Sequence, residues 1–464
     1  MDMQWIIYDG ENGLGEFFDE EKNKSKKHKR DDRLVPFKTK TDRNTYDNFT
    51  GVLGHISRLL TGTTMSKKVS LVNELAKNLR LKMEDCGDSD FDVFLAIVKS
   101  IYFEDDKLMP VNIKALNYIE SNVTQQQVAE YIFSLFIENT GLEEKYNQMI
   151  VDEDTNVLDD LVFQSLEDND CGGNEYIRAE CLLPYVKECF CADYGALIKN
   201  SQDYKAYALR MLAYYYYFYI SQLAVKLMKF EKADRNKIEP IYMTLNWEVV
   251  TKVRQGYEYG WKYVKDRLGH MFSHSVLMEM LSHNVDDIHL DYIGLAEKFS
   301  GTEEDASVAR EIEYICEQYK AWIPMDYDKC IHSSDKDGNC EVSNITRRLF
   351  ELIDYQFING GRTSHYNGYN KKFIEFAQKN FGKSRGTLGY TIGVTESDIV
   401  MFTRVILANN SGRMKLSTLF NEYEKRGLLF DRDSKVKITD LLSRMDLLEK
   451  RSDSGDAQYV KYVL

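Results

Sequence analysis

Residues 377–384, AQKNFGKS, come nearest to a known chemical motif. They match a permissive form of the phosphate-binding loop in which alanine replaces the first glycine. That loop binds phosphate because a buried strand delivers a glycine-rich turn to a helix N-terminus, where backbone N–H groups surround the ligand. The residues before it, KKFIEFAQKN, have a helical, half-polar pattern instead. We therefore predict no nucleotide binding here, and keep Lys383 and Arg385 as candidate contacts to backbone phosphates from a turn.

Histidines and cysteines occur at spacings that invite a metal-site interpretation. His270 and His274 are four residues apart, so both rings would share one face of a helix. The glutamate of the H-E-x-x-H zinc motif is absent, because Met271 takes its place. The cysteines show no C-x-x-C pairing, and their nearest groupings are Cys189 with Cys191, and Cys330 and His332 with Cys340. We predict packing or capping roles for these residues, no metal and no other cofactor.

No other pattern indicates a catalytic centre. The sequence contains no G-x-S-x-G nucleophile motif, and its carboxylate–lysine triplets at 20–22 and 143–145 lie in polar runs typical of solvated faces. The chain has 31 tyrosines, which gather at 214–217 and 257–263. Base stacking by these rings is one interpretation, but their helical spacing favours core packing. The sequence therefore predicts a protein that is not an enzyme.

Composition bounds the class of protein. The chain of 464 residues is 43% hydrophobic and carries a formal net charge of −14, which argues against coating DNA through net charge alone. The N-terminus MDMQWIIYDGENG lacks the basic start and apolar core of a signal peptide, so we expect a cytoplasmic protein with reduced cysteines. Residues 211–225 are uncharged but shorter than a membrane span, which predicts a buried helix and no membrane partner.

The elements that would position any site fall into five segments. Residues 1–50 form an irregular arm, in which 22–43 carry a local excess of seven positive charges. Apolar residues recur at helical spacing over 51–151, as in Phe91, Phe94, Leu95 and Val98, and Gly141 is a predicted helix C-cap. Residues 152–175 hold nine Asp or Glu and no Lys or Arg, which predicts a surface loop or linker. A central helical domain then spans 176–395.

The C-terminal segment, 396–464, has the most readable pattern. It predicts a first helix over 395–410 capped by Thr395 or Ser397, and a second helix closed by Gly427. A third helix follows over 434–445, capped by Asp431 or Asp433. Two short strands, LLEKRS and AQYVKYV, join through turn residues at 453–456. The fold class we predict is mostly α, with a C-terminal winged-helix module of three helices plus a β-hairpin.

The predicted module carries cations suited to phosphate contacts. They are Arg432, Lys435 and Lys437 on the third helix and Lys450, Arg451 and Lys461 on the wing. Residues 396–464 nevertheless balance twelve basic against eleven acidic side chains. A module that docks a protein and one that contacts DNA therefore both stay open.

Three long runs resemble a known family, the DptG (DndG) subunits of bacterial DNA phosphorothioation-dependent restriction systems. They are RLVPFKTK at 33–40, EPIYMTLNWEVVTKVRQGYEYGWK at 239–262 with the following FSHSVLMEML, and the tail RGLLFDRDSK with EKRSDSGDAQYVK. None of these runs is a catalytic motif.

The resemblance implies a non-catalytic subunit in anti-phage defence. Such proteins accompany an ATPase subunit and a helicase-like translocase subunit, and the three together attack DNA that lacks the phosphorothioate mark. The implied role is to bridge these partners, with direct DNA contact left open. The alternatives are a free-standing winged-helix transcriptional regulator, which would dimerise on a defined operator, and an ATPase built on residues 377–384.

Overall fold

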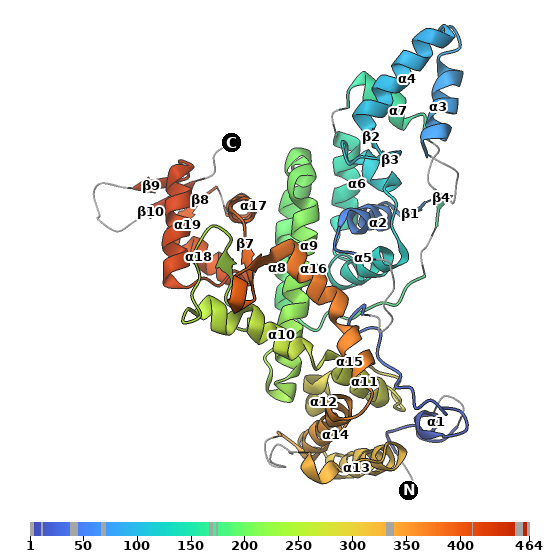
Figure 1. Cartoon of the computed structure of the whole chain (residues 1–464), viewed down its shortest axis with the longest axis vertical. Coiled ribbons are helices and arrows are strands. Elements are labelled where there is room, and N and C mark those ends of the chain that lie inside the picture. Colours follow the sequence, from blue (N-terminus) through green and yellow to red (C-terminus); the bar gives the residue numbers. More distant parts are fainter. Residues whose placement is uncertain are drawn as a thin grey trace.

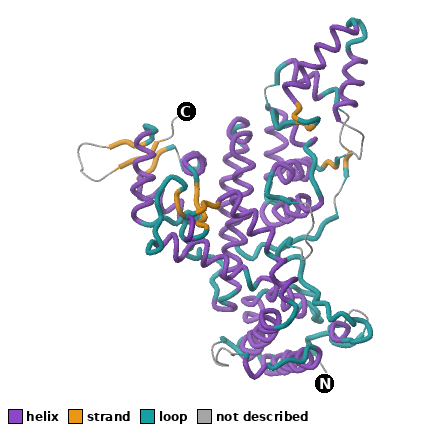
Figure 2. Tube along the Cα trace, viewed as in Figure 1, coloured by secondary structure: helices purple, strands orange, loops and turns teal. Residues whose placement is uncertain are grey.

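The computed structural model describes residues 4–10, 13–37, 45–65, 71–153, 155–166, 170–172, 175–330, 338–410, 412–450 and 458–461. The protein is mostly α-helical, as predicted, and its strands are short (Figure 2). Figure 1 shows the long helix α9 (Ser201–Leu227) at the centre. Around it lie the N-terminal helices, the group from α11 (Met271–Leu281) to α14 (Glu341–Asn359) and the C-terminal elements.

Helix α9 forms the centre of the main core. Its residues from Met211 to Leu227 are buried, which confirms the predicted buried helix, and Tyr214 to Tyr217 all pack inside. None of the helices in the described ranges has the length and apolar composition that crossing a membrane requires. Four helices that precede α9 in the sequence surround it. They are α2 Thr50–Thr61, α5 Val123–Phe136, α6 Leu142–Asp152 and α8 Pro184–Ile198.

A smaller unit stands at the far end of the N-terminal helices (Figure 1). Its apolar residues, among them Leu75, Leu79 and Val98, form a separate small core. We call residues 71–118 and 157–166 the projecting unit. Its elements are α3 Leu71–Lys82, α4 Asp88–Tyr102, α7 Val157–Phe163 and the hairpin β2 Phe103–Glu104 with β3 Lys107–Leu108. A two-residue pairing of β1 Thr63–Thr64 with β4 Asp170–Cys171 lies beside it.

The described residues of the N-terminal arm are irregular apart from the short helix α1 Gly15–Phe18. It is nevertheless packed, because Trp5, Phe17 and Val35 are buried in the main core. The buried carboxylate of Glu311 accepts hydrogen bonds from the backbone amides at positions 4–6, of which that of Ile6 is 2.8 Å long. The arm therefore lies against α13 Asp305–Trp322.

The remaining helices continue the body toward the C-terminus. They are α10 Lys262–Leu268, preceded by a kinked turn at Tyr257–Trp261, α11 Met271–Leu281, α12 Tyr292–Phe299, α14 Glu341–Asn359, α15 Thr363–Tyr369 and α16 Lys371–Phe381. Short 3-10 turns occur at Lys114–Tyr118, Phe230–Lys232, Tyr327–Lys329 and Gly386–Leu388.

Two small three-stranded sheets lie near the C-terminal end of the molecule. In the first, β7 Tyr390–Val394 is the middle strand, parallel to β5 Thr244–Leu245 and antiparallel to β6 Gly382–Ser384. The second is antiparallel in the order β8-β10-β9, formed by Arg413–Lys415, Gln458–Lys461 and Leu448–Lys450. The second sheet accompanies α17 Glu396–Ala408, α18 Leu416–Lys425 and α19 Arg432–Arg444. Strand β8 of this sheet was not predicted from the sequence.

The local capping signals are confirmed at three positions in this region. Thr395 caps α17 by accepting a hydrogen bond from the Asp398 amide, and Asp431 caps α19 by accepting one from the Ser434 amide. Gly427 follows α18 with a φ of +78°. The predicted turn at 453–456 lies outside the described residues.

Two expectations for the N-terminal half differ from the structure. The C-cap assignment of Gly141 is wrong, because α5 already ends at Phe136 and Gly141, at φ +74°, precedes α6. The acidic stretch expected as a loop or linker contains helix α7, whose Val162 is buried in the small core. Its carboxylates Asp159 and Asp160 are half-buried, and Asp159 accepts a hydrogen bond from the Tyr102 hydroxyl of the same core, so the acidic stretch is anchored there.

Candidate functional site

The C-terminal elements are fixed to the body by arginine–carboxylate pairs. We call residues 396–461 the C-terminal module. Each of its three helices has such a pair at one end, and two parallel N–H···O bonds of this kind set orientation as well as distance. The pairs are Arg210 with Asp398 at 2.6 and 2.7 Å, Arg426 with Asp193 at 2.7 Å for both bonds, and Arg254 with Asp431.

Glu248 joins three segments at the start of α19. Its buried carboxylate accepts hydrogen bonds from the Ser434 hydroxyl at 2.7 Å and from the Leu245 amide at 2.8 Å, and it pairs with Arg254 at 3.2 Å. Its backbone carbonyl accepts a hydrogen bond from Arg385 at 2.8 Å. The β6–β7 hairpin and the first turn of α19 therefore meet on the same loop.

The N-terminal end of α19 is occupied within the chain. The Asp431 carboxylate accepts the Ser434 amide at 3.0 Å and also binds the Arg254 guanidinium. Burial alone would raise the pKa of Asp431, but the hydrogen bonds from Arg254 and Ser434 outweigh it and hold the pKa below its ordinary value. A charged cap therefore fills the position where a free helix N-terminus would attract an anion.

The predicted contact residues of this region have different surroundings. Arg432 and Lys437 on α19 and Lys383 on β6 are exposed. Lys435 pairs with Glu424 at 2.7 Å. Arg385 is turned inward, because its guanidinium also donates to the Leu245 carbonyl and the Thr391 hydroxyl. The structure thus brings Lys383 and the α19 cations, predicted from separate motifs, onto one region of the molecule.

The predicted wing residues are only partly described. Lys461 on β10 pairs with Glu449 at 3.3 Å, and Arg413 pairs with the same carboxylate at 2.9 Å. Lys450 ends strand β9, but its side chain lies outside the described residues, as does all of Arg451.

A groove of about 440 Å³ runs along the exposed side of α19. Its lining combines apolar, basic and acidic side chains: Gln255, Phe430, Asp431, Arg432, Lys435, Val436, Thr439 and Asp440. Beside it, Val249 and Val253 are 85% and 82% exposed, on the same loop as Lys252. This surface carries both charge signs together with exposed apolar groups. Such a surface suits contact with a protein, whereas a uniformly basic surface would suit contact with DNA.

The sequence analysis did not single out Glu248, Arg254, Val249 and Val253 as candidate site residues. All four lie within the 239–262 run that carries the family resemblance. That run was the available signal, because neither spacing nor composition links Glu248 to Ser434, 186 positions further along the chain.

Residues 377–384 have the reverse of the phosphate-loop architecture. Helix α16 runs through Phe381, and Gly382 to Ser384 then form strand β6, so a helix leads into a strand. The backbone amides of Gly382 and Ser384 belong to the antiparallel β6–β7 region, with Gly382 opposite Ile392. The segment therefore has no helix N-terminus at which a phosphate would be bound.

The candidate metal residues have other partners. His270 contacts Asp354 at 2.9 Å, while the buried His274 contacts the Tyr292 hydroxyl at 2.7 Å and stacks on Phe350. Burial, and then the charge of His270, lowers the pKa of His274 well below its ordinary value. Cys330 and Cys340 are buried, and burial raises the pKa of Cys330 to about 11. His332 lies outside the described residues.

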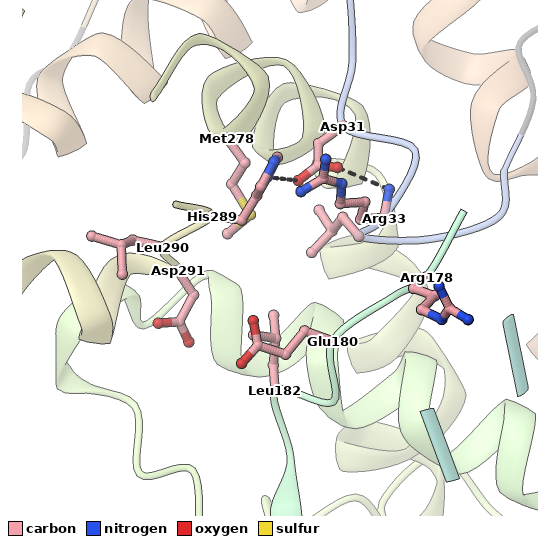
Figure 3. A pocket seen from close by; sticks show the side chains of 10 residues that line it. Asp31, Arg33, Arg178, Glu180, Leu182, Met278, His289, Leu290 and Asp291 are labelled. Carbon is pink, nitrogen blue, oxygen red and sulfur yellow. Dashed lines mark hydrogen bonds and ion pairs between the residues drawn. The ribbon is translucent and has the colours of Figure 1, made fainter. Parts of the chain in front are cut away.

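Figure 3 shows a second hollow, of about 170 Å³, between the arm and the body. Several of its ionisable groups have partners within the chain. Asp31 accepts the Arg33 amide at 2.8 Å and lies 3.5 Å from His289, Asp291 caps α12, and Arg178 pairs with Glu138 at 2.8 Å. Of these contacts, the one between Asp31 and His289 joins the arm to the body.

Neither a protein-family model nor a curated protein matches this chain.

Proposed function

We propose that this protein is a non-catalytic subunit of a DNA phosphorothioation-dependent restriction complex. In this proposal it bridges an ATPase and a helicase-like translocase, and its C-terminal module is a winged helix that docks one of them. The three long runs that resemble DptG support the assignment to such a system. Two of them, at 239–262 and in the tail, meet at the Glu248 cluster.

The order of elements supports the winged-helix interpretation. The chain runs helix, strand, helix, helix, strand and strand over α17 to β10, and the three strands form one antiparallel sheet. In this interpretation helix α19 corresponds to the helix that enters the major groove in DNA-reading members of the architecture.

The closed N-terminus of α19 is the observation that favours a protein partner. DNA-reading modules present the N-terminal residues of this helix to base edges. Here the first turn is engaged by Asp431, Arg254 and Glu248, and the groove beside it carries both charge signs. A helix that is held firmly at its first turn, with exposed valines nearby, suits contact with another subunit.

Contact with the DNA backbone is the second candidate. It is favoured by the exposed cations Arg432, Lys437 and Lys383, which need no access to base edges to bind phosphates. A free-standing regulator would depend on the same residues.

Charge reversal at Arg432→Glu together with Lys437→Glu tests the proposal. The double variant should lose co-purification with the ATPase or translocase and lose restriction in cells, while its DNA affinity changes little. Lys262→Glu with Lys265→Glu, at two exposed positions of α10, makes the same charge change elsewhere and should behave as wild type.

Two outcomes would overturn this function for the module. Retained co-purification with a loss of DNA affinity that shrinks as salt rises would indicate backbone contact instead. If the double variant restricts fully and its co-purification and DNA affinity are both unchanged, the module does not carry this function. For the non-catalytic role, the purified chain should not hydrolyse ATP, and magnesium-dependent turnover abolished by Lys383→Ala would contradict it.

A further inference from the structure

Helix α4 of the projecting unit is apolar on two sides. One side, with Phe91, Val98 and Tyr102, is buried in the small core. Away from it, Val93, Ile97 and Ile101 are 60%, 49% and 43% exposed. Their spacing of four residues places them in one row along the helix.

This row differs from the other exposed apolar residues. Among the helices in the described ranges, α4 alone carries more than one exposed large apolar side chain. Ala96 and Ser100 are also exposed and flank the row, so a partner helix can approach closely there. Figure 1 places α4 at one end of the molecule, away from the α11–α14 group and the C-terminal module. Contiguous exposed apolar surface of this kind marks interaction sites.

Both ends of the row are acidic. Asp90 and Asp92 are exposed at the N-terminal end, and Glu104, Asp105 and Asp106 are exposed in the hairpin that follows the C-terminal end. Asp88 is engaged by Arg80 at 2.5 Å, whereas no ion pair to Asp90 or Glu104 comes from the described residues. The exposed cations of α4 and its hairpin are Lys107, in the hairpin, and Lys99, which lies on the Asp92 side of the helix.

This charge pattern selects against a second copy of the chain. An antiparallel α4 pair centred on Ile97 would place Asp90 opposite Glu104. A parallel pair would place Asp90 opposite Asp90. Like charges facing one another across paired helices are destabilising, so the acidic ends favour a partner of opposite charge.

We propose that the row Val93, Ile97 and Ile101 is a docking site for an amphipathic helix of a partner protein. The partner helix carries an apolar stripe in its middle and Lys or Arg at both ends. The stripe covers the α4 row, and the basic ends meet the two acidic ends. This inference uses only the exposure and charge of α4, so it stands apart from the proposed restriction function.

Synthetic helical peptides test the proposal on the full chain. One peptide has a Leu/Ala stripe with Lys at both ends, and a second has the same stripe with Glu at both ends. Fluorescence anisotropy should show at least tenfold tighter binding of the Lys peptide at low salt. The preference should shrink as salt rises, because exposed charges are screened.

Variants locate the site. Ile97→Asp changes an exposed position, so the fold should survive, and binding of the Lys peptide should be lost. Val151→Asp, at a 76% exposed position at the end of α6, is the matched control and should bind as wild type. Asp90→Lys with Glu104→Lys should weaken the preference for the Lys peptide, because Asp92, Asp105 and Asp106 remain.

Each contrary result overturns the inference. Equal binding of the two peptides, binding of neither, or full binding by Ile97→Asp would remove the site or its charge selectivity. Sedimentation that shows a dimer abolished by Ile97→Asp would assign the row to a second copy instead.

Discussion

The C-terminal module and the projecting unit are attached to the body in opposite ways. The module shares the main core, to which it contributes Phe402, Leu419 and Leu442, and its helices are held by arginine–carboxylate pairs. The projecting unit has its own small core and keeps an apolar row in contact with solvent. Buried ion pairs add little net stability but fix orientation. We infer that the module is held in one orientation, whereas the projecting unit can unfold locally while the body stays folded.

The largest expected effect comes from Arg426→Met. Asp193 is fully buried and receives two bonds from Arg426 at 2.7 Å, so the variant leaves a buried charge without its cation. The free energy of unfolding in urea should fall by about 3–5 kcal/mol. The matched control is Arg178→Met, which breaks an exposed pair with Glu138 and should cost about 0–1 kcal/mol. Equal losses would contradict the buried-pair account.

Leu79→Ala tests whether the projecting unit unfolds separately from the body. Leu79 is fully buried in the small core, so its truncation should cost roughly 2–5 kcal/mol. Hydrogen exchange should lose protection mainly over 71–118 and 157–166, because the buried residues of the small core lie within these ranges. Leu212→Ala in α9 is the comparison and should lower protection across the body. A uniform loss in Leu79→Ala would mean that the two regions open together.

Gly427→Ala tests how tightly the module is seated. The residue has a φ of +78°, and an added Cβ would lie 2.2 Å from the Phe218 ring of α9. Gly62→Ala is the control, since Gly62 has a φ of +66° with nothing within 4 Å. The Gly427 variant should be less stable than the control by about 1–3 kcal/mol in thermal unfolding, the usual cost of overpacking. Equal stability of the two variants would mean that the module can move away from α9 without a cost in free energy.

The smallest effect concerns the pH dependence of the α19 cap. The pKa of Asp431 is lower in the folded protein than its ordinary value of 3.8, so the folded state gains stability above that pH and loses it as pH falls through the lowered pKa. Arg254→Met should raise the pKa of Asp431. The stability difference between wild type and this variant should therefore shrink below about pH 4. Arg444→Met, which breaks an exposed pair with Glu396, should show no such convergence.

Local sequence determined the helices and several of their ends. Thr395 and Asp431 were predictable as caps because each bonds a backbone amide only three residues away. The buried helix over 211–225 was predictable because its uncharged residues cover every face. Strand β8 was missed because its three residues acquire strand structure only by pairing with β10, which lies more than forty positions later.

Tertiary structure decided the candidate sites. The contacts of Arg254 with Asp431 and of Arg426 with Asp193 join residues 177 and 233 positions apart, and no local pattern specifies such pairs. In α4 the sequence supplied apolar residues on two sides. Packing against α3 and α7 buried Phe91 and Val98, and so left Val93 and Ile97 exposed. Periodicity fixes that a helix forms, whereas the neighbour that covers one side decides which residues remain available for a partner.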